Sequence, residues 1–261
     1  MNNKKCVVVI PAYRKLQPIE LSFLENGLLK TAGFEQVIVA PDDLIIDDSF
    51  GKLSNLRVAR FPNHFFKDIA GYNRLMISTD FYSRFADFKY LLTLQSDVYL
   101  FKNELDYWCD QSYDYIGAPW YKAAVLKKRS LRAWVFRNIR QPLLTRKRAG
   151  GWLANKVGNG GLSLRNISSA IKTLKLCDAE LFKTYWNPSS HHYNEDVFWS
   201  IEAPKINREF RIARWDEALK FAVEFEPQNA LKKMEGELPF GCHSPILMDP
   251  DFWKKYIPEM N

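Results

Sequence analysis

The sequence lacks long apolar segments and repeats and has few cysteines, and each shortage excludes a class of protein. Its apolar runs are only as long as a strand, which argues against a membrane-spanning helix, and the run at residues 6–11 is too short for a secretion signal. We therefore expect a soluble, cytoplasmic protein. The four cysteines are scattered and show no zinc-binding spacing. Because a chain of this size has so few of them, we expect reduced thiols rather than disulfides. Without low-complexity tracts or internal repeats, solenoids and disordered tails are excluded.

What is present suits a folded α/β protein with one unusual segment. The 261 residues are 47% hydrophobic, which is enough for one large domain or two small ones. The net charge of +7 is unevenly distributed. Residues 121–157 contain eleven basic side chains and no acidic one, so the rest of the chain has a net charge of −4. The basic character therefore belongs to that segment alone.

The first hundred residues alternate between strand and helix patterns. Apolar runs predict strands at residues 6–10, 36–40 and 89–94, and helical spacing predicts helices at residues 16–32 and 70–85. A strand, helix and strand in this order predict a parallel sheet. Further along, we expect strands at residues 113–118 and 157–164, a helix from Asn166 or Ser168 to Leu176, and another that Asn194 caps and that runs to Ile201.

Asp97 directly follows the predicted strand at residues 89–94, where an open parallel sheet places its ligands. A carboxylate at that edge can bind a divalent cation, which neutralises a diphosphate. A strand can equally end in an aspartate that only caps a turn.

The glycine-rich segment at residues 157–165 reads VGNGGLSLR. Clustered glycines let the backbone approach a ligand closely, and Asn159 offers both a donor and an acceptor. The spacing fits neither an ATP-binding P-loop nor a dinucleotide-binding motif. A tight turn is the alternative interpretation.

Two acidic residues, Glu195 and Asp196, begin the predicted helix after Asn194. Acids in a first turn are stabilised by the helix dipole, which is the structural explanation. The functional one is that one of them acts as a general base while the other stays structural, because neighbours on a helix face about 100° apart. His243 is a candidate ligand near the C-terminus, and the pair at residues 191–192 competes with it.

Taken together and in order, these motifs resemble a mainly bacterial glycosyltransferase-like domain family. The matching segments lie between Asn73 and Ser244 and read YLLTLQSD at 90–97, YDYIGAPW at 113–120, VGNGGLSLR at 157–165, NEDVF at 194–198, FAVE at 221–224 and GCH at 241–243. Their arrangement is also similar to GT-A enzymes of the β1,4-galactosyltransferase and fringe/β1,3-galactosyltransferase type.

This resemblance implies a GT-A fold, a mixed and mostly parallel sheet flanked by helices, in one domain over residues 1–261. Residues 1–100 would form the nucleotide-sugar-binding half, and residues 101–261 the acceptor-binding half with the basic insertion at 121–157. It also implies an inverting transfer from a nucleotide-sugar, with a weak preference for UDP, to a saccharide or lipid-linked acceptor. The roles implied residue by residue are a metal ligand at Asp97, donor and acceptor contacts at Gly160 and Gly161, the base at Asp196 and a second metal ligand at His243.

The usual D-x-D motif of such enzymes has two acids, whereas this chain has Gln95 and Ser96 before Asp97. Asp97, His243, two diphosphate oxygens and water would still complete an octahedral site, and the imidazole favours Mn²⁺ over Mg²⁺. Weak metal affinity and independence of metal both stay open.

We further expect that the donor meets residues at the end of the first two strands and beside the metal. Tyr13 could stack on the base, with Pro11, Ala12 and Asp42 nearby at the sheet edge. The remaining expected donor contacts are Asn73, Gln95, Ser96 and Asn159.

The basic segment and two rival functions complete the set of hypotheses. Apolar residues interleave with the arginines of residues 121–157, as in a helix lying on an anionic membrane surface, although a solvated lid fits equally well. A nucleotidyltransferase would normally have a glycine-rich loop after the first strand, and residues 9–14 contain no glycine. A nucleic-acid-binding protein could use the basic segment, but the remainder is acidic and no such motif occurs.

Overall fold

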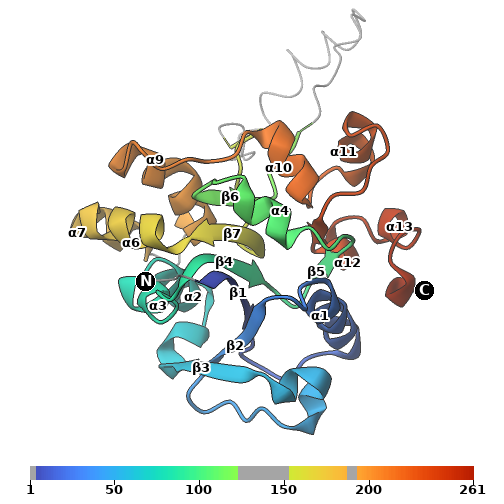
Figure 1. Ribbon diagram of the computed structural model, residues 1–261, viewed down its shortest axis with the longest axis horizontal. Helices are drawn as coiled ribbons and strands as arrows, with labels where there is room; N and C mark the ends of the chain where they lie inside the picture. Colours follow the sequence, from blue (N-terminus) through green and yellow to red (C-terminus); the bar gives the residue numbers. More distant parts are fainter. Residues whose placement is uncertain (1–3, 123–152, 187–192) are drawn as a thin grey trace, which may run out of the picture.

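A six-stranded mixed sheet forms the centre of the protein, in the order β3-β2-β1-β4-β7-β6 (Figure 1). The computed structural model describes residues 4–122, 153–186 and 193–261. The strands are β1 (Lys4–Pro11), β2 (Glu35–Pro41), β3 (Arg57–Phe61), β4 (Phe88–Leu94), β6 (Tyr115–Gly117) and β7 (Leu162–Asn166). Strands β1 to β4 are parallel, and β7 is antiparallel to both β4 and β6. The expected mixed α/β sheet is therefore present.

Three of the five predicted strands lie where the apolar runs placed them, and two are shorter. Strand β6 covers Tyr115–Gly117 of the predicted 113–118. Strand β7 begins at Leu162 instead of Val157, because Asn159 has a left-handed backbone (φ 59°) that a strand does not tolerate. Val157 makes only an isolated bridge to Pro119. The glycines thus lie in a loop before the strand. Strand β3, which contains two arginines, was not predicted.

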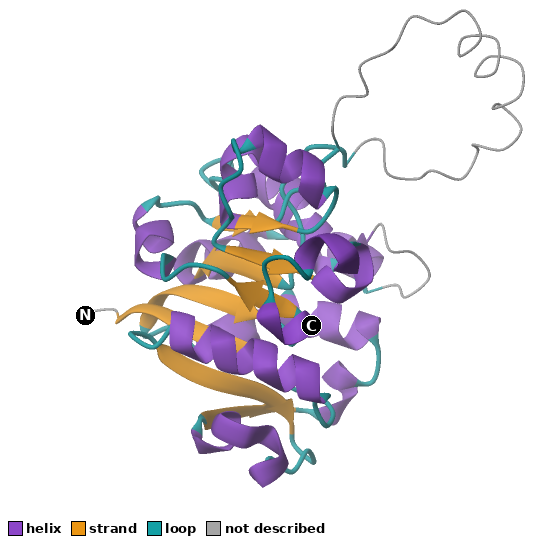
Figure 2. Cartoon of the chain, turned by 90° about the vertical axis from the view of Figure 1, so that its right-hand side faces the viewer, coloured by secondary structure: helices purple, strands orange, loops and turns teal. Residues whose placement is uncertain are grey.

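Helices flank the sheet on both sides (Figure 2). The α-helices are α1 (Pro18–Lys30), α2 (Ile69–Met76), α3 (Thr79–Ser83), α4 (Leu105–Asp110), α6 (Ile167–Leu176), α7 (Ala179–Tyr185), α8 (Glu195–Val197), α9 (Ala203–Ile206), α10 (Trp215–Phe221), α11 (Pro227–Lys233), α12 (Pro245–Met248) and α13 (Pro250–Trp253). Short 3₁₀ helices η1 (Asp48–Asn55), η2 (Asn63–Phe66) and η6 (Pro258–Met260) and the π-helical turn η5 (Phe198–Glu202) complete the set.

The helix boundaries follow local capping chemistry. Helix α1 begins with Pro18 in its first turn and a capping box between Gln17 and Glu20. The single helix predicted at residues 70–85 is wrong: the structure has two, because Ser78 accepts a hydrogen bond from Phe81 N and starts α3. Asn166 caps α6 as predicted.

The helix predicted from Asn194 to Ile201 is composite. Helix α8 passes into the π-turn η5 and then into α9, which extends the helical stretch to Ile206. Asn194 stands at the N-cap position, but its side chain makes no capping bond and instead accepts a hydrogen bond from Asn73. A π-turn inside a helix often accompanies a functional site.

A second, three-stranded sheet lies beside the first and was not predicted. Its order is β5 (Val98–Leu100), β9 (Gly241–His243) and β8 (Ala222–Val223). It packs on α1 through β5 and buries Trp253 and Phe23 in a small apolar cluster of its own. The strands are two or three residues long, too short to show as a sequence pattern.

The remaining expectations concern cysteines, membrane helices and the basic segment. All four cysteines are free thiols. Among the described residues, none of the helices is both long and apolar enough to cross a bilayer. The membrane-binding helix expected in residues 121–157 lies mostly outside the described residues, since only its two ends, 121–122 and 153–157, belong to them.

Candidate active site

Four strands bring the predicted functional residues together at one edge of the large sheet. Strands β1 and β4 are parallel, so Pro11 and the residues after Leu94 share that edge. Strand β7 runs the other way and pairs Leu162 with Leu94, which places the preceding glycines at the same edge. Strand β9 pairs His243 with Val98, the residue directly after Asp97. The small sheet therefore positions His243 next to Asp97.

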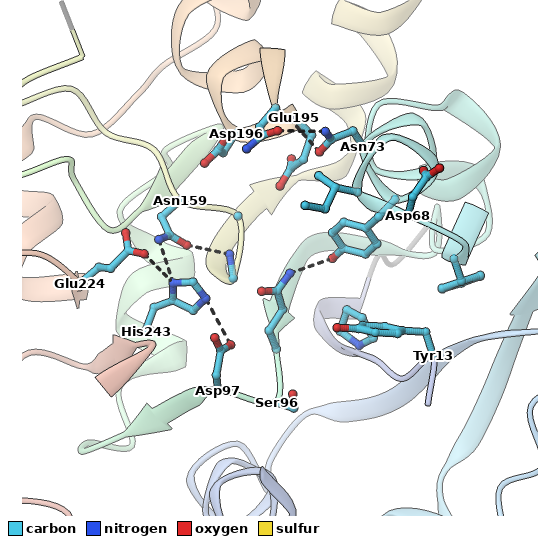
Figure 3. Close-up of a pocket in the computed structure, with 18 of the residues that line it drawn as sticks. Tyr13, Asp68, Asn73, Ser96, Asp97, Asn159, Glu195, Asp196, Glu224 and His243 are labelled. Atoms are coloured by element: carbon cyan, nitrogen blue, oxygen red, sulfur yellow. Dashed lines mark hydrogen bonds and ion pairs between the residues drawn. The ribbon is translucent and has the colours of Figure 1, made fainter. Parts of the chain in front are cut away.

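A pocket of about 900 Å³ opens at this edge. Its lining consists of Pro11, Tyr13, Arg14, Glu20, Phe66, Lys67, Asp68, Ile69, Tyr72, Asn73, Gln95, Ser96, Asp97, Trp120, Asn159, Gly160, Gly161, Asn194, Glu195, Asp196, Glu224, Phe225, His243 and Met248. In Figure 3, Asp97, His243 and Glu224 lie on one side, Tyr13 and Asp68 on the other, and Glu195 and Asp196 along a third.

The pocket collects nearly every residue singled out from the sequence. Ala12 and Asp42 are the exceptions: the Ala12 side chain is buried and its N–H bonds to Val39 O, while Asp42 is exposed and its carbonyl accepts a hydrogen bond from Arg60. Neither lines the pocket. The competing pair at residues 191–192 lies outside the described part of the chain.

His243 is the centre of a hydrogen-bonded group on one wall. Its Nε2 lies 3.2 Å from Asp97 Oδ1, and its Nδ1 lies 3.2 Å from Glu224 Oε1 and 2.8 Å from Asn159 Nδ2. Ser244 Oγ donates to Asp97 Oδ2 at 2.6 Å. Both carboxylates thus fix the imidazole, and Figure 3 shows the ring between them.

When the ring is neutral, these contacts allow two positions for its single proton. A proton on Nε2 is donated to Asp97, and Nδ1 then accepts from the Asn159 amide. A proton on Nδ1 is donated to Glu224, which leaves the Nε2 lone pair facing the Asp97 carboxylate. The second arrangement is the one that metal-binding histidines adopt, with a carboxylate behind the ring.

Asp97 and His243 therefore fit a divalent cation as a two-residue ligand set. The Asp97 side chain is 41% exposed and faces the pocket, so further ligands can reach the site. Among the described residues, no group of three or more His, Cys, Asp or Glu is arranged to hold a metal. Two protein ligands leave positions for diphosphate oxygens and water.

The same contacts shift the pKa values of both groups. Burial by itself would raise the pKa of Asp97, but hydrogen bonds from His243 and Ser244 lower it below its ordinary value. Burial would lower the pKa of His243, but hydrogen bonds to Asp97 and Glu224 raise it to about 10. At neutral pH Asp97 is thus an anion and His243, with no cation bound, is protonated on both nitrogens, and a cation at Nε2 would replace that proton.

A buried ion pair supports the opposite wall. The guanidinium of Arg165, at the end of β7, meets the Glu195 carboxylate through two nitrogens, at 2.9 and 3.0 Å. Their side chains are 1% and 5% exposed. The backbone N–H of Glu195 also donates to Asn73 Oδ1 at 3.2 Å. Strand β7 and helix α2 therefore both hold the start of α8.

Asp196 follows directly in the chain and lies in a different environment. It lines the pocket, and its Oδ1 accepts a hydrogen bond from its neighbour Val197 N at 2.8 Å. Burial and the nearby charge of Glu195 raise the pKa of Asp196 to about 7. A carboxylate titrating there is suited to accept a proton at neutral pH.

The glycines of the loop before β7 make room for the protein's own side chains. A methyl group on Gly158 would overlap the Trp120 indole, one on Gly160 would overlap the Glu195 carboxylate, and one on Gly161 would overlap the His243 ring. All three of these side chains line the pocket. The protein's own packing therefore requires these glycines, and because Gly160 and Gly161 also line the pocket, a close approach of backbone to ligand stays a prediction.

The side of the pocket that carries Tyr13 has aromatic and basic residues. Tyr13 is 53% exposed, and the Arg14 guanidinium lies 5.7 Å from its ring centre. Glu20 holds Arg14 with two hydrogen bonds, at 2.7 and 2.8 Å, and accepts another from Ser96 Oγ. This contact links helix α1 to the segment between β4 and β5.

One comparison with known proteins identifies a family for this chain. Residues 55–243 match the family described as "Protein of unknown function (DUF5672)". The chain belongs to this family. The DUF5672 match begins before helix α2 and ends at His243, so it contains Asp97, Arg165, Asp196 and Glu224 but not Tyr13, Arg14 and Glu20.

Other comparisons add less. No curated protein matches the chain. One similar solved structure is titled "crystal structure of a glycosyltransferase involved in the glycosylation of the major capsid of PBCV-1"; it has 12% sequence identity, covers 92% of this chain and 93% of its own, and has a TM-score of 0.46.

Several DUF5672 residues in the pocket or behind its wall had no predicted role. Arg165 and Glu224 both stand in quoted motifs, but a strand pattern cannot show that Arg165 reaches Glu195 or that Glu224 reaches His243. Tyr72 and Asp68 come from α2, and Trp120 from the loop after β6. A charged residue inside an apolar strand, as Arg165 is in LSLRN, is the one signal that pointed to a buried partner.

Proposed function

We propose that the protein is an inverting glycosyltransferase. It would transfer a sugar from a nucleotide-sugar, with UDP the first candidate, to a hydroxyl of a saccharide or lipid-linked acceptor in the synthesis of a bacterial surface polysaccharide. One observation supports this above all: a single pocket holds an anionic, half-exposed Asp97 beside His243, and across from them a carboxyl, Asp196, whose pKa is near 7. Glycosyl transfer needs both groups, because the donor loses its nucleoside diphosphate and the acceptor hydroxyl loses its proton.

The proposed reaction assigns the proton and the electron pair to opposite sides of the pocket. Asp196 accepts the proton of the acceptor hydroxyl, whose oxygen forms a bond to the anomeric carbon. The bond from that carbon to the diphosphate oxygen breaks, and its electron pair leaves with the nucleoside diphosphate. Attack from the side opposite the leaving group inverts the configuration at the anomeric carbon.

Asp97 and His243 would hold a divalent cation, Mn²⁺ or Mg²⁺. When bound, such an ion neutralises the charge that develops on the leaving diphosphate. Glu224 keeps the His243 ring oriented by accepting a hydrogen bond at Nδ1. Ser244 restrains the second oxygen of Asp97, so the first faces His243 and the pocket.

The Tyr13 side suits the nucleoside and its phosphates. The exposed phenol ring offers a stacking surface for the base, and Arg14 and Lys67 are the basic side chains of the lining outside the His243 wall. Deeper in the pocket, Asp97, Asp196 and Glu224 carry acidic groups that would repel phosphates in the absence of a cation. The donor would therefore bind with its base at Tyr13 and its sugar toward Asp196.

A donor screen tests the proposal. UDP-, GDP- and CMP-sugars are added with Mn²⁺, and thermal stability and release of nucleoside diphosphate are measured. We expect one nucleotide class to raise the melting temperature and to be hydrolysed slowly in the absence of acceptor. Stabilisation by nucleoside triphosphates with release of pyrophosphate would instead identify a nucleotidyltransferase. Failure of every nucleotide-sugar to bind would refute the proposal.

A further inference from the structure

The carboxyl that the sequence could not separate from Asp196 has a position of its own in the structure. Glu195 is buried against Arg165, whose fork of nitrogens meets both carboxylate oxygens. Arg165 is itself held: its Nε and one terminal nitrogen donate to Ser163 Oγ, and the other donates to Tyr82 OH at 3.0 Å. The guanidinium also lies over the Tyr115 ring, 5.5 Å from its centre.

This network meets the loop of the pocket at one point. The Glu195 carboxylate occupies the space beside Gly160 where any other residue would place its Cβ. Gly160 O in turn accepts a hydrogen bond from Ser163 Oγ at 3.1 Å. Since Ser163 also accepts from Arg165, the loop, the ion pair and strand β7 form one rigid unit behind the pocket.

We propose that the Arg165–Glu195 pair is a positioning device, which sets both the location of Asp196 and the pH at which Asp196 accepts a proton. The inference rests on the proposed function, in which Asp196 is the base. Neither member needs to touch substrate, because the pair acts through the backbone of α8 and through charge. Glu195 is then a positioning residue rather than a second base.

The position of Asp196 follows from two anchors on the residue before it. Arg165 holds the Glu195 side chain from β7, and Asn73 holds its N–H from α2. Helix α8 has only three residues before it passes into a π-turn, so it has little stiffness of its own. Loss of the Arg165 anchor therefore frees the segment that carries Asp196.

The charges around Asp196 come from several elements. Glu195 on α8 and Glu224 after β8 disfavour its ionised form, and Arg165 on β7 favours it. Tyr115 on β6 and Tyr185 on α7 also face it, but both have pKa values raised by burial and are neutral. The pair thus places one charge of each sign near Asp196, with the negative member closer in the chain.

The direction of each substitution follows from these signs. Glu195→Gln removes a negative neighbour and leaves Arg165 charged, so the pKa of Asp196 falls. Arg165→Lys keeps the positive charge but loses the two-nitrogen contact, so the position of Asp196 changes more than its pKa does. The double variant Arg165→Gln with Glu195→Gln removes both charges, and because Glu195 affects Asp196 more than Arg165 does, its pKa lies between those of Glu195→Gln and the wild type.

Two readouts on the full-length protein test the inference. The first is a ¹³C-carboxyl NMR titration of aspartate-labelled protein, with the Asp196 signal assigned by its loss in Asp196→Asn. The second is the pH profile of kcat with the donor found in the screen. We expect Glu195→Gln to lower the Asp196 midpoint and the acidic limb of kcat together by roughly one pH unit.

The variants separate charge from position. Arg165→Lys should lower kcat by about tenfold with the acidic limb nearly unmoved, as a slight displacement of a base does. If Glu195→Gln lowers kcat equally at every pH and leaves the NMR midpoint in place, the pair is only structural and the inference is overturned. Should Glu195→Gln not fold, an unshifted midpoint in the double variant relative to wild type, together with full kcat in Arg165→Lys, also overturns it.

The two readouts also separate this inference from the proposed function. An NMR shift in a protein without transferase activity would retain the coupling between the pair and Asp196 and reject the glycosyl transfer. Transferase activity with an unshifted Asp196 midpoint would retain the function and reject the pair's role.

Discussion

Asp97 and Asp196 line the same pocket, yet their surroundings shift them in opposite directions. Asp97 is half-exposed and bonded to His243 and Ser244, which keep its pKa low. Among the described residues Asp196 has a backbone partner and an acidic neighbour, and burial together with that neighbour raises its pKa to about 7. Two carboxyls whose pKa values are pushed apart generally divide the chemistry between them. Here the anion faces a cation or diphosphate, and the neutral-pH titrating group faces a proton donor.

The two walls also differ in how they are supported. Asp97 is fixed by side chains from the three-stranded sheet, through His243 and Ser244 of the β9 segment. Asp196 is fixed mainly through its own backbone, because Glu195 next to it is the residue that makes the side-chain contacts. A change at one wall should therefore affect binding, and a change at the other should affect turnover.

The largest expected effect is the loss of turnover in Asp196→Asn. Without a group to accept the acceptor's proton, kcat should fall by about 10²–10⁴-fold, while the Kd of the donor measured by calorimetry stays within about twofold. The matched control is Asp68→Asn, a second pocket carboxylate that caps α2 through Gly71 N, since asparagine caps equally well. Unchanged kcat in Asp196→Asn would remove Asp196 from the reaction.

The next effect concerns metal-dependent donor binding on the opposite wall. Asp97→Asn and His243→Gln should each weaken donor binding in Mn²⁺ by about 10–100-fold, and EDTA should do the same to the wild type. The control is Asp114→Asn, a buried aspartate outside the pocket lining whose hydrogen bond from Arg211 N an asparagine can also accept. Equal donor affinity in Mn²⁺ and in EDTA would show that Asp97 binds the donor without a cation.

A third prediction concerns the loop that joins the two walls. Gly160→Ala and Gly161→Ala force a methyl group into the Glu195 carboxylate and the His243 ring, and should destabilise the protein by about 2–3 kcal/mol in denaturant unfolding. Gly33→Ala is the control, because its methyl group would meet open space, and it should leave stability almost unchanged. If Gly161→Ala instead retained full stability, the packing of His243 against the loop would not be tight.

How much of this could be predicted from the sequence depends on the distance between partners along the chain. The apolar runs of β1, β2 and β4 and the cap of α6 are local patterns, and these predictions are confirmed. The contact of Asp97 with His243 depends on a pairing of β5 with β9, two strands of three residues separated by some 140 positions, and short strands leave no periodic signal.

The site shows the same division between local and distant information. The residue types at Asp97, Asp196 and His243 marked them as candidates, whereas the roles of Arg165 and Glu224 depend on partners that only the fold supplies. The glycine motif was recognised, but the side-chain packing that needs these glycines was not. The side chains that occupy the space come from residues 120, 195 and 243. Buried polar networks are specified by three-dimensional packing, and sequence spacing cannot describe them.

A final effect follows from the unfavourable position of Asp196 itself. In the unfolded chain an aspartate has a pKa near 3.9, whereas in the folded protein the pKa of Asp196 is about 7. The folded state therefore binds more protons than the unfolded state between these values, and stability falls as the pH rises through that window. Asp196→Asn removes this penalty, so it should raise the free energy of unfolding at pH 8 by up to about 4 kcal/mol relative to its effect at pH 4. Urea unfolding at both pH values measures the difference, and Asp97→Asn is the opposing control.

Because Asp97 has a lowered pKa, its ionised form stabilises the fold, and its loss should cost stability at pH 8. Equal changes in both variants would erase the distinction between the two aspartates.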